Sequence, residues 1–509
     1  MAQAFGIAVA ITATLLFAAE PAYSQEQQSS SPDRIDWRAV AIADIEAAYA
    51  AFKNEHPGYH DPVNPDFREQ LEQAHERGLD FANRITKPED FVVALDAFSS
   101  ALRDGHAQLY PTNAYYNMVP ELRRWPGFVA NWRGTGTRVT KALPEHETLV
   151  GAEITGCDGQ PVRELIERNV FALLHRPEEP GQWWSRAHNL FIDSRFDGLD
   201  MLGSTLPSKC DFVRLDGQRE THTLSWSEVP ANVQSENWFY RSWIGENSYI
   251  GLTEPRPGLF VIGLPDFQPN SEGEAAYEQL FADLSARHDE LANARAIVID
   301  MRGNNGGSSV WPKRVAQLLW GERFIDPVMD KYHANTSVWW RNTPAVREQV
   351  KLYSELPELP DYYKSILKEL ADNMVRANPQ ASPLVVEPKA SNDVSSEPAL
   401  PLIADIPIYV ASDGSCASSC NNGLDIFTRF PGTKLIGAPS SADSTYLEVR
   451  YENTPSGYAR MILPMKVYVG RPLRPGPADT YPSDIPVTSA DWSTNRFLDL
   501  IEQDLENSR

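Results

Sequence analysis

Residues 294–307, ARAIVIDMRGNNGG, join a short apolar run to a loop of polar residues and glycines. The run from Ala294 to Asp300 is rich in branched aliphatic side chains, which is typical of a strand buried on both faces. Glycines in the following loop leave backbone N–H groups uncovered by side chains, and such amides can hold an oxyanion. A tight turn between a strand and a helix explains the same loop equally well.

The flanking sequence predicts that this strand belongs to an α/β core. Residues 259–263 (LFVIG) and 407–411 (PIYVA) are further candidates for buried strands, and residues 274–292 have the spacing of an amphipathic helix. Strands that alternate with helices favour an α/β architecture from about residue 229 to residue 509. The intervening residues, about 325–400, are rich in Pro, Asn and Ser with one helical patch (344–376), so we expect an insertion or lid-like excursion.

A second segment with catalytic potential is SDGSCASSC, residues 412–420. It follows the predicted strand ending at Ala411 and precedes apolar residues at helical spacing, so its hydroxyls lie where a helix begins. The positive end of a helix can assist a nucleophilic hydroxyl. Ser is also a favoured residue for capping a helix, and capping alone accounts for this composition.

A third segment, ALRDGH, ends at His106. Apolar residues from Trp37 to Leu109 recur at helical spacing, which predicts an N-terminal helical domain over residues 25–111. Histidine titrates near neutral pH and can act as a general base. A histidine just after a glycine is also compatible with an ordinary helix end.

Residues 112–228 change to short alternating segments, which indicate a β-rich domain. GAEITGCDGQPV (151–162) has the pattern of a strand, an Asp-Gly turn and a second strand, and a similar hairpin signal spans 212–224. The sequence therefore predicts an α/β multidomain protein with an N-terminal helical domain, a β-rich domain and an α/β core.

The N-terminus and the charge constrain location and partners. The apolar run 5–19 followed by Ala-Tyr-Ser at 22–24 predicts a signal peptide over residues 1–24 and a periplasmic or secreted protein. The run itself is too short for a comfortable membrane span, and no other stretch approaches the length of a spanning helix. The formal net charge of −23 disfavours nucleic acid as a partner.

The four cysteines are Cys157, Cys210, Cys416 and Cys420. An oxidising compartment permits disulfides, and Cys157 with Cys210 is the more natural long-range pair, although sequence alone leaves the pairing open. The sequence contains neither a CxxC motif nor an HExxH motif, so we predict no metal site and no cofactor.

Taken together, these segments resemble the S41 family of serine peptidases, which includes the tail-specific and C-terminal processing proteases. The similar motifs are DGH at 104–106, DMRGNNGG at 300–307 with the preceding GLFVIGLPDF at 258–267, SCASSCN at 415–421 and IGAP at 436–439. The resemblance implies a ClpP/crotonase-like β-β-α catalytic core and a degenerate PDZ-like module over 112–228. It also implies peptide or protein substrates, Ser418 as the nucleophile, and the N–H groups of Gly307 and Ser419 as the oxyanion hole.

The resemblance leaves the other catalytic groups less defined. The family's bacterial processing proteases use a lysine base, but this chain has Asp443 near that position. The tricorn-like branch uses a histidine at the DGH position, which implies His106 as the general base. Asp479 is the predicted orienting acid, with Asp484 and Asp443 as rivals.

Several alternatives remain open. A cysteine nucleophile is disfavoured because an exported thiol is usually oxidised. A catalytically inactive S41-like protein could bind peptides or other ligands on the same fold. A crotonase-like acyl-CoA enzyme is opposed by the export signal, because coenzyme A is cytosolic. A homo-oligomer is compatible with the sequence.

Overall fold

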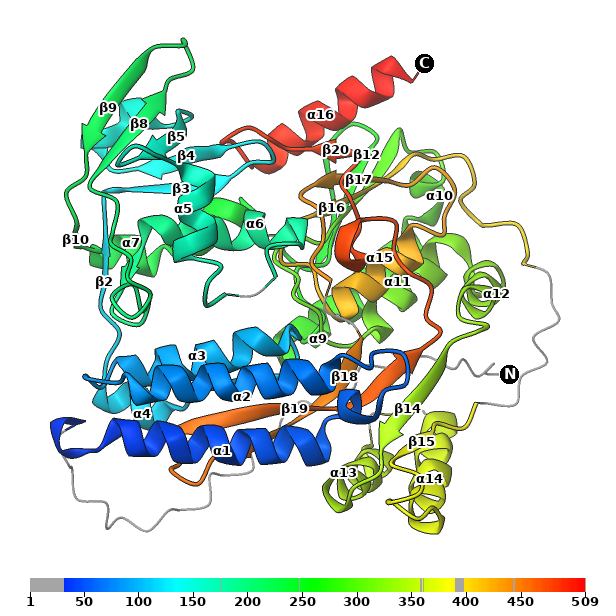
Figure 1. Cartoon of the computed structure of the whole chain (residues 1–509). Helices are drawn as coiled ribbons and strands as arrows, with labels where there is room; N and C mark the ends of the chain where they lie inside the picture. The colour runs from blue at the N-terminus through cyan, green and yellow to red at the C-terminus, as the bar shows by residue number, and fades with distance from the viewer. Residues whose placement is uncertain are drawn as a thin grey trace. The chain divides into compact units, whose positions relative to one another are not determined.

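The computed structural model describes residues 32–174, 176–246, 248–357, 359, 361–389, 398–442 and 445–508. The predicted signal peptide, residues 1–24, and Asp443 lie outside the described residues. The chain divides into two compact units, each assembled from segments that are far apart in the sequence (Figure 1). Unit 1 comprises Met1–Pro120, Arg323–Ala399 and Asp443–Leu473, and unit 2 comprises Glu121–Glu322, Leu400–Ala442 and Arg474–Arg509.

Unit 1 contains the predicted N-terminal helices and a five-stranded sheet. In the first helix, Asp36 caps the backbone N–H of Ala39 at 3.1 Å, and Pro57 follows its end. The helices α1, α2 and α3 lie beside the strands of the sheet in Figure 1. The elements of unit 1 are η1 (Pro32–Arg34), α1 (Trp37–Glu55), η2 (Pro57–His60), α2 (Phe67–Asn83), α3 (Asp90–Leu102), β1 (Gln108–Pro111), α4 (Asn113–Met118), α12 (Glu322–Tyr332), β14 (Ser337–Arg341), α13 (Pro344–Glu355), α14 (Asp361–Arg376), β15 (Leu384–Val386), β18 (Tyr446–Asn453) and β19 (Ala459–Val469).

The segment predicted as a lid-like excursion contributes strands as well as helices to unit 1. β14 lies between β19 and β15 in the sheet order β1-β19-β14-β15, and β18 pairs with β19. The predicted helical patch forms two helices rather than one, because α13 ends shortly before Pro357, and proline excludes the preceding residues from a continuing helix. Trp340 of β14 and Leu367 of α14 are completely buried in a shared core.

Unit 2 is built on a six-stranded sheet with the order β11-β12-β13-β16-β17-β20. β11 is antiparallel to β12, and the other pairs are parallel. The three predicted strands are confirmed as β12 (Leu259–Gly263), β13 (Ala296–Asp300) and β16 (Ile408–Ser412), and every residue in them is buried. Because parallel strands end at the same edge of a sheet, the loops after β13 and β16 are neighbours, with Asp300 opposite Ala411.

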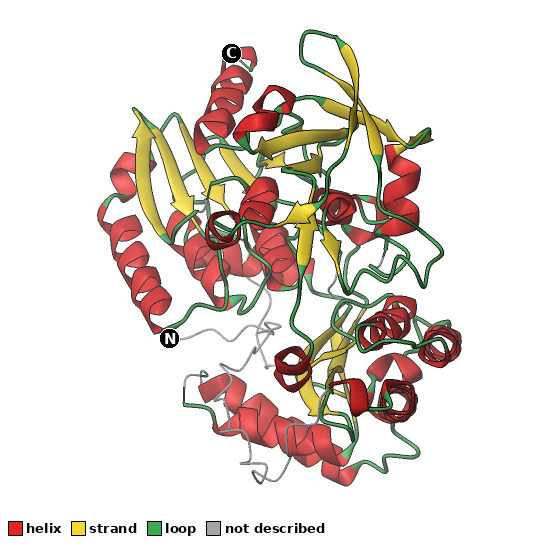
Figure 2. Ribbon diagram, turned by 90° about the vertical axis from the view of Figure 1, so that its left-hand side faces the viewer, coloured by secondary structure: helices red, strands yellow, loops and turns green. Residues whose placement is uncertain are grey.

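A second, antiparallel sheet of unit 2 has the order β3-β4-β5-β8-β9, with β6 paired to β5. Both predicted hairpins are confirmed: β5 turns into β6 through Asp158 and Gly159, which both have positive φ, and β8 pairs with β9. Figure 2 shows the sheets flanked by helices.

The elements of unit 2 beside β12, β13 and β16 are β2 (Arg123–Trp125), β3 (Phe128–Trp132), β4 (Thr137–Ala142), η3 (Pro144–Leu149), β5 (Glu153–Cys157), β6 (Gln160–Pro161), α5 (Val162–Asn169), α6 (Pro180–Arg186), η4 (Ala187–Phe191), β7 (Asp193–Ser194), β8 (Lys209–Val213), β9 (Arg219–Thr223), β10 (Ser227–Glu228), α7 (Ala231–Ser235), α8 (Trp238–Ile244), β11 (Gly251–Arg256), α9 (Ser271–Ala286), α10 (His288–Leu291), α11 (Val310–Trp320), α15 (Ser419–Phe427), β17 (Lys434–Gly437), η5 (Pro477–Asp479), β20 (Ile485–Pro486) and α16 (Thr494–Asn507).

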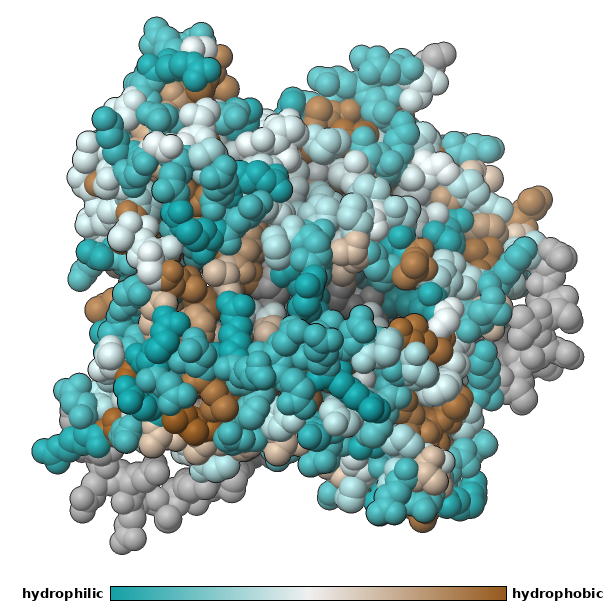
Figure 3. Space-filling model, viewed as in Figure 1, coloured by the Kyte–Doolittle hydropathy of each residue, from teal (hydrophilic) through white to brown (hydrophobic). Residues whose placement is uncertain are grey.

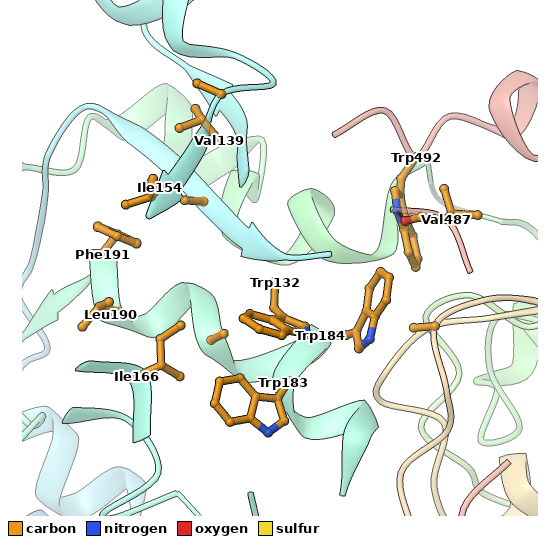
Figure 4. Packing of buried hydrophobic residues seen from close by; sticks show 14 of the residues in the cluster. Trp132, Val139, Ile154, Ile166, Trp183, Trp184, Leu190, Phe191, Val487 and Trp492 are labelled. Atoms are coloured by element: carbon orange, nitrogen blue, oxygen red, sulfur yellow. Dashed lines mark hydrogen bonds between the residues drawn. The ribbon is translucent and has the colours of Figure 1, made fainter. Parts of the chain in front are cut away.

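One hydrophobic cluster joins the two large sheets of unit 2. Trp132 and Trp183 have ring centroids 4.9 Å apart, and Trp184 and Trp492 have centroids 5.6 Å apart (Figure 4). Trp132 comes from the antiparallel sheet, whereas Trp492 precedes α16 beside the parallel sheet. The large aromatic area buried in this cluster makes the two sheets parts of one core.

On the face shown in Figure 3, hydrophobic residues form separate patches among hydrophilic ones. Within the described part of the chain, no helix combines the length and the apolar character that crossing a bilayer requires.

The fold agrees with the predicted α/β multidomain class. The assignment of the two large sheets of unit 2 to PDZ-like and ClpP/crotonase-like modules stays a prediction from the resemblance. The predicted boundaries at 25–111, 112–228 and 229–509 also stay predictions, since they divide the sequence into consecutive segments, whereas the compact units do not.

All four cysteines form disulfides, and the favoured pair Cys157–Cys210 is confirmed, with the second bond between Cys416 and Cys420. The first closes a loop across 53 positions and the second across 4.

Because the longer loop restricts the unfolded chain more, replacing both Cys157 and Cys210 by Ala should lower the free energy of unfolding by about 4 kcal/mol. Replacing Cys416 and Cys420 by Ala is the matched comparison and should cost about 2 kcal/mol less. Urea denaturation measures both losses, and equal losses would contradict the prediction.

Candidate active site

The predicted nucleophile lies in a strained turn between a strand and a helix. β16 ends at Ser412, α15 begins at Ser419, and Ser418 has φ 52° and ψ −126°. An L-residue rarely adopts this backbone conformation, and strain of this kind is concentrated at functional sites. The side chain of Ser418 is partly exposed at the N-terminus of α15, where the helix dipole favours developing negative charge.

A disulfide encloses this turn. Cys416 and Cys420 lie on either side of Ser418, and both side chains are buried. The alternative of a cysteine nucleophile is therefore wrong for the oxidised protein, because a disulfide-bonded sulfur carries no thiolate. The carbonyl of Cys416 also accepts the N–H of Ser441 at 2.9 Å, which ties the turn to the segment after β17.

The glycine loop lies against the nucleophile turn. A Cβ atom placed on Gly306 would come within 2.9 Å of Cβ of Ser418 and within 3.0 Å of the backbone N of Ser419. Gly306 has φ 109° as well, so only glycine fits at this position without strain. The hydroxyl of Ser419 donates a hydrogen bond to the carbonyl of Gly307.

Backbone hydrogen bonds fix the end of the glycine loop beside the nucleophile turn. Phe267 forms a parallel bridge with Gly307 through the carbonyl of Gly306 and the N–H of Ser308. The Gly307 carbonyl accepts the Ser419 hydroxyl, so Gly307 lies against the start of α15.

A buried ion pair anchors the glycine loop. Arg302 donates two hydrogen bonds to Asp300, at 2.9 and 2.7 Å, and both side chains are almost completely buried. The Arg302 guanidinium also donates to the carbonyl of Trp492 at 2.9 Å and to the hydroxyl of Thr494 at 3.0 Å. The Asp and Arg of the DMRGNNGG motif therefore fix the start of the loop.

Asp413 is a site residue that the sequence reasoning did not assign. Its carboxylate accepts the backbone N–H of Gly303 and, at 2.7 Å, that of Ser415, so it connects the glycine loop to the nucleophile loop. Burial raises the pKa of Asp413, and the hydrogen bonds from Ser415 and Gly303 oppose that shift. In the sequence, the only indication of a site role for Asp413 is its position directly after the buried strand β16.

The predicted base, His106, lies in unit 1, in the turn between α3 and β1. Asp104 accepts the backbone N–H of His106 at 3.0 Å and contacts Nε2 of His56 at 3.2 Å. Nδ1 of His56 accepts the N–H of Gly58 at 2.9 Å, so the ring proton is on Nε2 and is donated to Asp104. The Asp of the DGH motif thus shapes the turn that carries His106.

The two candidate acids among the described residues both bind groups of their own unit. Asp479 accepts the backbone N–H of Arg474 at 2.6 Å and its Nη1 at 3.2 Å, and the Arg474 guanidinium also binds the buried Asp425. Asp484 accepts the N–H of Leu435 at 2.7 Å. The orienting role of either carboxylate stays a prediction.

The structure brings Ser418, Ser419 and Gly307 together within unit 2. Asp479 and Asp484 belong to the same unit, whereas His106 belongs to unit 1. The predicted nucleophile and the residues predicted to form the oxyanion hole are therefore neighbours in unit 2, and the catalytic roles of all these residues stay predictions.

The buried His56–Asp104 pair predicts lower stability in acid. Burial lowers the pKa of His56, so below about pH 6.5 the unfolded chain takes up a proton that folded His56 resists. Asp104 also makes the folded chain less stable in acid, but at a lower pH. Burial raises the pKa of its carboxyl group, and the bonds from His56 and His106 outweigh burial and hold this pKa below the ordinary 3.8. Stability should therefore fall by up to about 1 kcal/mol per pH unit as the pH drops below neutrality.

A His56→Gln variant tests this origin. Glutamine can donate to Asp104 and accept from Gly58 without titrating, so the urea midpoint should change less between pH 7.5 and pH 5.5 than in the parent chain. His146→Gln, at a partly exposed histidine, should keep the parental pH response. An unchanged response in His56→Gln would show that another group causes the acid sensitivity.

Comparison with solved structures identifies the fold. No family model matches the sequence, and no curated protein sequence matches it. The structure of mature CPAF superposes with a TM-score of 0.61 at 13% sequence identity, covering 92% of this chain and 98% of CPAF. CPAF complexed with lactacystin gives a TM-score of 0.58 at 12% identity, covering 93% and 98%. The chain thus has the fold of CPAF, an S41-family peptidase, and the resemblance to S41 peptidases in its motifs is confirmed at the level of the fold.

Proposed function

We propose that this protein is an exported serine peptidase that hydrolyses peptide bonds in peptides or proteins through an acyl-enzyme on Ser418. The observation that carries the proposal is the strained Ser418 turn at the start of α15, which lies in close contact with the glycine loop. The shared fold with an S41 peptidase supports the same reading.

The chemistry follows from the groups at this turn. Oγ of Ser418 attacks the carbonyl carbon of the scissile bond, and the carbonyl oxygen becomes an oxyanion. The N–H groups of Gly307 and Ser419 stabilise this charge, because fixed dipoles need no reorganisation in the transition state. The leaving amine takes a proton as the peptide bond breaks, and water then attacks the ester to release the acid and restore the hydroxyl.

His106 is the proposed general base. It would accept the Ser418 proton and pass it to the leaving amine. Two features support this assignment: the resemblance at the DGH motif, and the hydrogen bond from the His106 backbone to Asp104, which holds the turn. Asp479 is the proposed orienting acid, with Asp484 and Asp443 as rivals.

Export is part of the proposal. The predicted signal peptide supports it, and so do the two disulfides, because such bonds persist mainly in oxidising compartments. A catalytically inactive ligand-binding protein on the same fold is the alternative.

The Ser418→Ala variant tests the nucleophile. Peptidase activity on an unfolded protein substrate should fall by about a thousandfold or more, because the acyl-enzyme can no longer form. A fluorophosphonate probe should label the parent chain at Ser418 and leave the variant unlabelled. Ser271→Ala, at an exposed serine of α9, is the matched control and should keep both activity and labelling. If the parent chain neither hydrolyses protein nor reacts with the probe, the inactive alternative is supported.

His106→Gln tests the base. The variant should lose about a thousandfold in kcat while binding substrate with similar KM, and the acid limb of the pH–rate profile should disappear. Asp479→Asn and Asp484→Asn, measured in parallel, distinguish the two described acid candidates by which of them lowers kcat. Retention of the acid limb in His106→Gln would exclude this residue as the base.

A further inference from the structure

A cleft of about 890 Å³ lies within unit 2, and its lining includes no residue of the nucleophile turn or the glycine loop. Its walls come from β4, from the end of α8 and from the loop that precedes α16. The volume falls in the range of ligand-binding clefts. Nothing in the proposed hydrolysis uses these residues.

The side chains of this cleft carry mostly positive charge. Arg138, Lys141, Arg241 and Arg496 line it, against two acids, Glu246 and Asp491. The whole chain has the opposite balance, with a net charge of −23. A local excess of cations in an acidic protein favours an anionic ligand at that place.

The two acids are already engaged by backbone groups at the start of α16. Glu246 accepts the N–H of Thr494 at 2.9 Å, and Asp491 accepts the N–H of Ser493 at 2.8 Å. Their carboxylates hold the chain at the start of α16 and keep their charge, so the lining retains a positive excess because four cations face two acids.

The cations are only partly paired. Arg138 binds Glu153 at 2.8 Å, and Lys141 lies 3.8 Å from Glu236. Burial lowers the pKa of Lys141, Glu236 opposes the shift and the nearby charge of Arg241 adds to it. Among the residues that the structure describes, Arg241 and Arg496 form no ion pair, so two cations lining the cleft remain available to a ligand.

A fifth cation lies behind the cleft wall. Arg133 is completely buried, donates to the carbonyl of Ser242 at 2.6 Å and stacks 4.5 Å from the ring of Trp492, and both of these residues line the cleft. Its Nε and Nη1 have no hydrogen-bond partner in the described part of the chain. Burial lowers the pKa of Arg133 to about 9, so the group is still charged at neutral pH and adds to the positive potential.

The cleft also offers apolar contacts. Val150 and Leu215 line it, and their side chains are 38% and 81% exposed. Exposed aliphatic residues beside unpaired cations match a ligand that combines carboxylates with aliphatic side chains. A peptide has both, whereas a nucleic acid lacks the aliphatic groups and would be repelled by the charge of the chain.

We propose that this cleft is a second peptide-binding site, which holds an acidic peptide segment through Arg241 and Arg496 with an adjacent aliphatic side chain against Val150 and Leu215. The site binds independently of the chemistry at Ser418, so it stands whether or not the chain hydrolyses peptides. The recognised carboxylates come from Asp or Glu side chains or from a peptide C-terminus.

Fluorescence anisotropy with labelled peptides tests the site. The full chain carrying Ser418→Ala is used, so that hydrolysis cannot consume the probe. A peptide of alternating Glu and Leu should bind, and the same peptide with Gln in place of Glu should bind roughly tenfold or more weakly. Added salt should weaken binding of the acidic peptide, because partly exposed charges are screened.

The double variant Arg241→Gln with Arg496→Gln should weaken binding of the acidic peptide by about tenfold. The matched control removes two exposed cations elsewhere in the same unit, Lys209→Gln with Arg219→Gln, and should bind like the parent. Circular dichroism of both variants checks that each is folded.

An acidic peptide that binds the folded double variant and the parent alike would overturn the proposal. Equal binding of the acidic and neutral peptides that persists after both C-termini are amidated would also overturn it, because neither source of carboxylate would then contribute. Amidating the peptide C-terminus identifies the source of the carboxylate: unchanged affinity indicates side chains, and a large loss indicates the terminal group. Either result supports the cleft as a carboxylate site if the double variant binds the peptide about tenfold more weakly than the parent.

Discussion

The parallel pairing of β13 with β16 is the constraint on which the candidate site depends. It sets Asp300 opposite Ala411, so the chain leaves both strands at the same edge of the sheet. The glycine loop and the nucleophile turn begin there, more than a hundred positions apart in sequence. The buried Asp300–Arg302 pair then fixes the first loop, and Asp413 connects it to the second. Shifting this register would separate the glycine loop from the Ser418 turn.

The strain at Ser418 is maintained by its surroundings. A residue with φ 52° persists only where other contacts determine the backbone, because a free turn would relax. Here a disulfide closes the turn, the Ser419 hydroxyl binds Gly307, and the Cys416 carbonyl binds Ser441. Glu179, ahead of α6, extends the support by accepting from the Ser441 hydroxyl at 2.8 Å. These contacts come from separate segments of unit 2, so the position of the hydroxyl depends on the packing of the whole unit.

Most carboxylates near the candidate groups hold the backbone in place. Asp104 receives His56 and the His106 amide, Asp413 receives two loop amides, and Asp479 receives Arg474. A carboxylate in a catalytic motif is therefore not automatically the catalytic acid. Asp479 and Asp484 both accept backbone N–H groups, so their contacts do not distinguish which of them orients the catalytic base. The cleft near α16 differs, because two of its lining cations, Arg241 and Arg496, form no ion pair with any residue that the structure describes.

The sequence by itself determined the local elements and the motifs. Runs of branched aliphatic residues located β12, β13 and β16, and the Asp-Gly pair located a hairpin. The resemblance of residues 415–421 to the S41 nucleophile segment pointed to Ser418. It also favoured the Cys157–Cys210 bond. The strands and the hairpin are encoded by neighbouring residues, so their patterns are visible in the sequence of a single chain. Only the tertiary structure decided the pairing of His56 with Asp104, the role of Asp413, the charged cleft and the incorporation of residues 323–399 and 443–473 into unit 1. Those features arise from contacts between residues far apart in the chain, and such contacts leave no local pattern from which they could be predicted.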